Sequence, residues 1–242
     1  RIAEFRLEVG PIFRMNDISG LDLEYKFGEA STIAQLLQHM GGYPDNLLLS
    51  HSPDLESDES LGDVLRADLP PRAFAPGLVS AYSDWGFSLL GYAIEGATGM
   101  PYEAALSELL FDPIGMAKST YAQPLPQGIF ENLATGYGWN YSKNRYDIVP
   151  HDFVRMSPGI ALVTNGDDMG AYMRTLLNDG NLDGNQIFNE DALAMLLERQ
   201  GSAHPYSRGW SYAFVENTIA GRPVLYKDGN GIGFTSRIVL IP

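Results

Sequence analysis

The chain has 242 residues and a formal net charge of −14, from 16 basic and 30 acidic side chains. This acidic excess disfavours nucleic acid and anionic membranes as partners, because phosphate groups are bound by clustered Lys and Arg. The sequence contains no cysteine, which excludes disulfides, thiolate zinc sites and a cysteine nucleophile. Its length and its apolar content of 45% predict a globular fold, as one large domain or two lobes that share a cleft.

The first third of the sequence predicts a strand, a helix and a long irregular stretch. Residues 1–14 alternate in polarity as a strand does. A helix is expected to begin after Thr32, where Gln35 completes a capping box, and to stop at Gly41. Residues 43–79 are expected to be irregular. Their acidic side chains predict a solvated surface loop in preference to a paired-carboxylate glycosidase site: Asp54, Glu56, Asp58, Glu59 and Asp63.

The middle of the sequence predicts two consecutive helices. A polar turn that contains Tyr82 leads into a helix at about 84–98, which Asp84 can cap and which Gly99 ends. A second helix is expected at about 102–111. No apolar run approaches the ~18 residues that a membrane-spanning helix needs.

The following segment is expected to alternate between loops and helices. Residues 120–163 are rich in Gly, Pro, Asn and Tyr, which predicts loops with short strands. Asn165 or Asp167 is expected to cap the next helix, and Asn189 to cap a last one. The first of these helices would turn its apolar side chains inward: Met169, Tyr172, Met173, Leu176 and Leu177.

The C-terminal part of the sequence changes to the period of strands. Three consecutive antiparallel strands are expected at 206–216, 222–227 and 233–241. The predicted fold class is therefore α+β, with an antiparallel sheet packed against a mostly helical lobe. A single two-lobed domain would span residues 1–242, with its sheet from about 1–14 and 206–242 and its helical lobe at about 30–200.

Five stretches resemble a known family and follow one another in the family's order. Tyr82-Ser83-Asp84, with the helix ending in Thr98-Gly99, resembles the Tyr-Ser-Asn block of class C β-lactamases, penicillin-binding proteins, DD-peptidases and family VIII carboxylesterases. The other four are the helix ending in His39-Met40-Gly41-Gly42, then Asp112-Pro113-Ile114-Gly115-Met116, then Ser157-Pro158-Gly159 with Asp168-Met169, and last Lys227-Asp228-Gly229 with Gly233-Phe234-Thr235-Ser236. The resemblance implies a β-lactamase/transpeptidase-like fold.

The resemblance also implies a serine hydrolase that works through an acyl-enzyme. Such chemistry needs a nucleophile, a base and donors for the oxyanion. Tyr82 would be the base, and Lys227 the cation that helps a phenol of ordinary pKa ~10 to ionise. Gly229 would let the substrate lie close to its strand, and the backbone N–H near Asn230 would be an oxyanion donor.

The nucleophile of the family, the Ser of a Ser-x-x-Lys helix, has no counterpart in this sequence. Phe13-Arg14-Met15-Asn16 matches the opening of the family motif, which places Asp17 at the Ser position and Gly20 at the Lys position. A helix of about twenty residues would be missing here, and a strand and a helix after Pro242. Either the sequence is an incomplete record of an active enzyme or it is a short form without the nucleophile. Ser19 is a third option, as a displaced nucleophile.

Asp84 is the second departure, because Asn is usual at its position. An ionised carboxylate only accepts hydrogen bonds, so Asp84 would pair with a cation such as Lys227. This substitution favours an ester or peptide substrate over a lactam. The sequence predicts no metal or cofactor, since His39, His51, His151 and His204 lack metal-ligand spacing. The alternative function is a binding module that kept the site and lost its nucleophile. The oligomeric state and the compartment stay open.

Overall fold

A computed structural model of the chain describes residues 21, 23, 27, 28, 30–45, 50–52, 59–151, 153–200, 209–212 and 214–242. The strand predicted at 1–14 and the candidate nucleophile Ser19 lie outside these residues. So do Asp17, Gly20 and three members of the acidic cluster, namely Asp54, Glu56 and Asp58.

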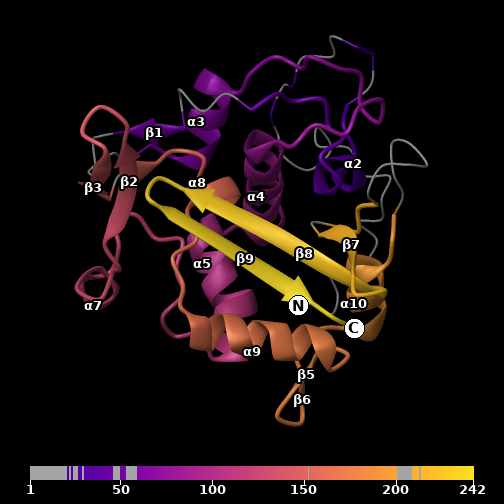
Figure 1. The fold of residues 1–242 in the computed structure, drawn as a ribbon. Helices are drawn as coiled ribbons and strands as arrows, with labels where there is room; N and C mark the ends of the chain where they lie inside the picture. Colours follow the sequence, from indigo (N-terminus) through magenta and orange to yellow (C-terminus); the bar gives the residue numbers. More distant parts are fainter. Residues whose placement is uncertain are drawn as a thin grey trace.

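A buried helix, α4, is the centre of the helical part of the molecule (Figure 1). Its side chains Trp85 and Leu89 are fully buried and pack with Leu36, Val64 and Met156 from three other segments. The described helices before residue 120 are α2 Ile33–Leu37, α3 Leu61–Asp68, α4 Asp84–Thr98, α5 Tyr102–Leu106, the π-helix η2 Ser107–Phe111, and α6 Asp112–Ile114. The predicted helices at 84–98 and 102–111 are thus confirmed, although the second ends in a π-helical turn.

The cap of α4 differs from the prediction. Ser83 is the N-cap, with φ −153° and ψ 113°, and its side chain accepts the N–H of Gly86. Asp84 is the first residue inside the helix instead. A serine oxygen on an extended residue reaches the third helical N–H, as N-caps commonly do. The carboxylate of Asp84 is therefore available for other contacts.

Helix α3 was not predicted, although its signals are present in the sequence. Its N-cap is Ser60, whose side chain accepts the N–H of Asp63 and donates to the Asp63 carboxylate. Val64 and Leu65 form its buried side. Asp63 is exposed, and Glu59 forms a surface ion pair with Arg155. The described members of the acidic cluster thus lie on the surface, as predicted, but Asp63 lies in a helix.

The later helices begin at the predicted caps. The side chain of Asn165 caps α9, Gly166–Leu177, and that of Asn189 caps α10, Glu190–Leu197. Leu176 is buried as predicted, but Leu177 is 43% exposed, so its inward orientation was wrong. At about 100° per residue, the next position along the helix already turns toward solvent. Two single-turn helices complete the described set: α7 Gln127–Phe130 and α8 Ser157–Ile160.

The predicted consecutive strands form a three-stranded antiparallel sheet in the order β7-β8-β9. Its strands are β7 Val215–Ile219, β8 Arg222–Gly231 and β9 Phe234–Leu240. The strand predicted at 206–216 lies partly outside the described residues, and its described part joins the sheet from Val215. Leu225 and Leu240 of the sheet pack against α9 and α10. The short strands form three antiparallel pairs: β1 His51–Ser52 with β4 Phe153–Val154, β2 Gly136–Asn140 with β3 Arg145–Val149, and β5 Asn181–Leu182 with β6 Asn185–Gln186.

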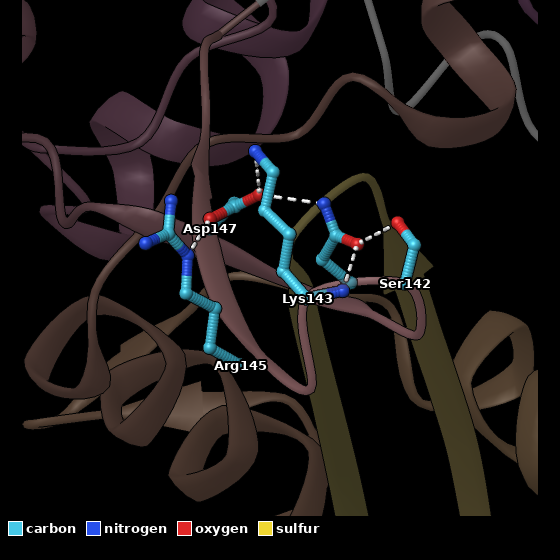
Figure 2. Close-up of polar contacts among 5 residues, drawn as sticks. Ser142, Lys143, Arg145 and Asp147 are labelled. Atoms are coloured by element: carbon cyan, nitrogen blue, oxygen red, sulfur yellow. Dashed lines mark hydrogen bonds and ion pairs between the residues drawn. The ribbon is translucent and has the colours of Figure 1, made fainter.

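The β2–β3 hairpin lies at the edge of the molecule (Figure 1). Its two faces carry different kinds of side chains. Figure 2 shows the polar face, where Asp147 accepts hydrogen bonds from Lys143, Arg145 and Asn140. The opposite face is apolar and exposed, with cross-strand pairs of aromatic and aliphatic side chains: Tyr137 with Ile148 and Trp139 with Tyr146.

Helix α8 packs closely on α4 because Gly91 has no side chain. A Cβ at Gly91 would lie 2.5 Å from Cβ of Pro158 in α8. Replacement of Gly91 by Ala is expected to lower the free energy of unfolding by about 1–3 kcal/mol, since overpacking forces backbone shifts. Urea unfolding measures this change. Gly170→Ala in α9 is the matched control, because nothing lies within 4 Å of its Cβ position, and it should not destabilise. Equal effects of Gly91→Ala and Gly170→Ala on the free energy of unfolding would contradict the close packing of α8 on α4.

Candidate active site

Two motifs 145 residues apart meet at the start of α4. The ammonium Nζ of Lys227, on β8, donates a hydrogen bond to Oη of Tyr82 at 3.2 Å. The phenol of Tyr82 in turn donates to Oδ1 of Asp84 at 2.9 Å. Lys227 also lies over the tyrosine ring, with Nζ 4.3 Å from the ring centroid. The structure therefore brings the three sequence candidates Tyr82, Asp84 and Lys227 together, and Asp84 is joined to Lys227 through the phenol.

The turn that carries Tyr82 is held by His39 on both sides. The backbone carbonyl of His39 accepts the N–H of Ala81 at 2.8 Å, and its Nδ1 accepts the N–H of Ser83 at 3.1 Å. Its ring lies 4.4 Å from that of Tyr82 and is almost fully buried, with Phe87 and Trp210 as further ring neighbours. His39 was expected to be structural or superficial, and its burial and contacts make it structural.

His39 should make the stability of the fold depend on pH. Burial, followed by the nearby Lys227 ammonium, lowers the pKa of His39 from 6.5 to about 3. The unfolded chain then binds a proton that the folded chain excludes, so the stabilisation is fully present above pH 6.5 and declines as the pH falls toward 3. In urea unfolding, the stability of wild type relative to His39→Asn should fall by up to about 1.4 kcal/mol per pH unit below 6.5.

The variant His39→Phe separates titration from packing. Asn keeps an acceptor for the Ser83 N–H, and Phe keeps the ring, but neither titrates. The difference in the free energy of unfolding between wild type and each variant should therefore change with pH in the same way, whatever its absolute size. A difference that stays constant between pH 7 and pH 5 would contradict the low pKa of His39.

Asp45 is a neighbour of the site that the sequence analysis did not identify. Its Oδ1 accepts the backbone N–H of Asp84 at 2.7 Å, across 39 residues of sequence. The stretch after Gly42 was predicted only as irregular, and a single acid within it carries no local signal for this contact. Asp45 fixes the first residue of α4 and places a second carboxylate beside Asp84.

The charges of the site favour a protonated phenol. Burial, and then the Asp45 carboxylate, raise the pKa of Asp84 from 3.8 to about 6. Burial, and then Asp84, raise the pKa of Tyr82 above its usual 10. The expected lowering of the phenol pKa by Lys227 is therefore not found, because desolvation and two carboxylates outweigh one cation. Burial lowers the pKa of Lys227 itself.

Gly229 and Asn230 lie at the far end of β8, opposite Ser236 and Thr235 of β9. A Cβ at Gly229 would meet the hydroxyl of Ser236, which can rotate away, so the neighbouring strand does not by itself require this glycine. No hydrogen bond joins Gly229 or Asn230 to Tyr82 within the described residues. Their roles toward a substrate and an oxyanion stay predictions.

The family stretch that contains Gly159 and Asp168 makes tertiary contacts in both of its parts. Gly159, on α8, faces Asp84 so closely that a Cβ there would lie 2.8 Å from the Asp84 carbonyl oxygen. Asp168 accepts hydrogen bonds from the backbone N–H of Lys118 and the hydroxyl of Ser119. Both parts thus connect helices to the rest of the fold.

Neither a metal-binding cluster nor a membrane-spanning helix is found in the part of the chain that the structure describes. No group of three or more His, Asp or Glu side chains there could hold a metal ion. His204 lies outside that part. None of its helices is long and apolar enough to cross a membrane.

The sequence model of the beta-lactamase family matches residues 22–242, and the chain belongs to this family. A curated relative from Escherichia coli K12, named as a D-alanyl-D-alanine carboxypeptidase, is 24% identical over 204 residues. That match covers 74% of this chain and 46% of the relative. The chain therefore spans about half the length of the curated relatives that it resembles.

Solved structures show the same fold. The penicillin-binding protein from Bacillus halodurans superposes with a TM-score of 0.74 at 23% identity, covering 100% of this chain and 73% of that one. The hydrolase EstCE1, described as having promiscuous acyltransferase activity, gives 0.71 at 17% identity, covering 93% and 69%. A class C beta-lactamase gives 0.68 at 18% identity, covering 97% and 68%. The predicted family and fold class are confirmed.

Proposed function

We propose that this protein is a serine hydrolase that cleaves an ester or amide through an acyl-enzyme. The observation that carries the proposal is the hydrogen-bonded series Lys227–Tyr82–Asp84, which joins the two most distant motifs of the site. A tyrosine that holds both a cation and a carboxylate can exchange a proton with a nucleophile. Small esters and peptides are the proposed substrates, because Asp84 replaces the amide that the lactam-processing relatives use.

The comparisons support this class without selecting one reaction. Proteins similar to this chain are named as a carboxypeptidase, a hydrolase with promiscuous acyltransferase activity and a class C beta-lactamase. All three names describe hydrolysis or transfer at an acyl carbon, which requires the same three elements. Ser19, outside the described residues, is the nucleophile that we propose to test within this sequence.

A binding module without turnover is the second candidate, and two observations favour it. The sequence has no Ser-x-x-Lys motif, and the phenol of Tyr82 has a raised pKa. Such a protein would bind an acyl compound at the same site and release it unchanged. It would show saturable binding of a peptide ending in D-Ala-D-Ala and no product.

Hydrolysis of a substrate panel separates the two candidates. The panel contains p-nitrophenyl butyrate, a peptide ending in D-Ala-D-Ala, and nitrocefin. The proposal predicts turnover of the ester or the peptide, with nitrocefin the poorest of the three. Pretreatment with a fluorophosphonate should abolish that turnover. Binding of the peptide without any product on the panel would favour the binding module and contradict the hydrolase.

A further inference from the structure

We propose that Asp84 is the terminal proton acceptor of the site and receives the proton of the nucleophile through the phenol of Tyr82. This inference rests on the proposed hydrolase function. It assigns to Asp84 a role that the Asn usual at its position could not have, because an amide is not a base at neutral pH. The presence of Asp in place of the usual Asn would then change which group finally accepts the proton of the nucleophile.

The donors and acceptors around Tyr82 give the direction of transfer. A phenol has one O–H and an oxygen that can accept two hydrogen bonds. Oη accepts one bond from Lys227 at 3.2 Å and uses its own proton for Asp84 at 2.9 Å. One acceptor position remains for the hydroxyl of a nucleophile. Tyr82 is 45% exposed as a residue and Asp84 only 6%, so the proton passes from a half-exposed tyrosine to a buried carboxylate.

The step balances without a further reactant. As a serine oxygen attacks the acyl carbon, its O–H bond breaks and its proton bonds to Oη of Tyr82. The original phenol proton moves to Oδ1 of Asp84, so Tyr82 stays neutral and Asp84 becomes a carboxylic acid. The C=O π electrons move to the carbonyl oxygen. When the tetrahedral intermediate collapses, the leaving group takes a proton back along the same path.

The surroundings of Asp84 suit a base that works near neutral pH. Three titratable groups act on Asp84: Asp45 after α2, Tyr82 in the preceding turn and Lys227 on β8. His39 lies behind the tyrosine ring. Burial and Asp45 raise the pKa of Asp84 to about 6, while Lys227 and the Tyr82 hydrogen bond oppose that rise. A group with this pKa is largely ionised at pH 7 and still holds a proton well enough to receive one.

The test replaces Asp84 by Asn, which keeps the size and the acceptor for the phenol but removes the basicity. The expected result is a fall of about 10- to 100-fold in kcat for p-nitrophenyl butyrate, with little change in KM. In wild type, kcat/KM should rise with pH to a plateau, with its midpoint near pH 6. That limb should be absent from Asp84→Asn. Asp147→Asn on the hairpin is the matched control and should behave as wild type.

Stability separates this role from a purely structural one. Because the folded pKa of Asp84 is raised from 3.8 to about 6, its contribution to stability is fully present below pH 3.8 and lost as the pH rises through 6. Asp84→Asn should therefore unfold in urea at pH 8 no more easily than wild type, although it hydrolyses p-nitrophenyl butyrate more slowly.

Each outcome decides between the inferences. Asp84→Asn that is as fast as wild type, or that keeps the acid limb, overturns the relay and leaves the hydrolase standing. Asp84→Asn that is slow only because it is partly unfolded at pH 8 also overturns the relay. Wild-type protein that hydrolyses nothing in the panel overturns the hydrolase and the relay together.

Discussion

Tyr82→Phe is expected to lower kcat/KM for p-nitrophenyl butyrate by about 100- to 10,000-fold, the range of a lost proton-transfer group. The ring of Phe keeps the tilted contact with the His39 ring, whose centroid lies 4.4 Å away, and the position of the Lys227 ammonium over the ring. Only the hydroxyl is lost, and with it both hydrogen bonds of the Lys227–Tyr82–Asp84 series. The steady-state rate at pH 7.5 measures the effect.

Tyr141→Phe provides the matched control for this change. Tyr141 lies at the turn of the β2–β3 hairpin and is 89% exposed, so removal of its hydroxyl should leave the rate unchanged. The fold of both variants is compared by urea unfolding. A near-normal rate in a folded Tyr82→Phe protein would remove the tyrosine from the mechanism, whatever group supplies the nucleophile.

Lys227→Met is expected to lower kcat/KM by about 100- to 1,000-fold, as does the loss of one preorganised electrostatic partner in other enzymes. Met fills the space of the lysine stem but leaves Asp84 and Asp45 without the cation that opposes their mutual repulsion. Since Lys227 lowers the pKa of Asp84, its removal should also move the acid limb of the pH–rate profile to a higher pH.

Two control variants show whether that loss of rate comes from the charge at Lys227: Lys227→Arg keeps the charge, and Lys143→Met removes a lysine outside the site. Arg keeps the charge and should retain the position of the acid limb, even if its longer planar group lowers the rate. Lys143 lies on the hairpin beside Asp147. Its replacement should change neither kcat/KM nor the acid limb of the pH–rate profile. An acid limb at the same pH in Lys227→Met as in wild type would show that the lysine does not act on Asp84.

Local patterns in the sequence predicted most of the helices because caps and periodicity are local properties. Thr32 with Gln35 forms the expected capping box, and Asn189 caps the expected helix. The three strands after residue 205 were predicted from their alternation and turns, and the described part of the first one is β7, which begins at Val215. Helix α3 was missed because its cap, Ser60, stands in a stretch of the sequence that is rich in acidic residues.

The site could be predicted in part, through motifs whose members pack together in the family. The sequence indicated Tyr82, Asp84 and Lys227, and the structure brings all three into one hydrogen-bonded series. It could not indicate Asp45, because a contact across 39 residues depends on tertiary packing. The sign of the phenol pKa shift was also beyond the sequence, since it depends on burial and on the positions of two carboxylates.

Mass spectrometry after treatment with a fluorophosphonate probe tests the central claim most directly. The 242-residue chain is incubated with the probe, its intact mass is compared with the unmodified 26.6 kDa, and the modified peptide is mapped. The hydrolase account predicts one adduct per chain on a serine, formed much more slowly in Tyr82→Phe and at the normal rate in Tyr141→Phe. A folded protein that forms no adduct, or forms one equally fast in all three proteins, would contradict it.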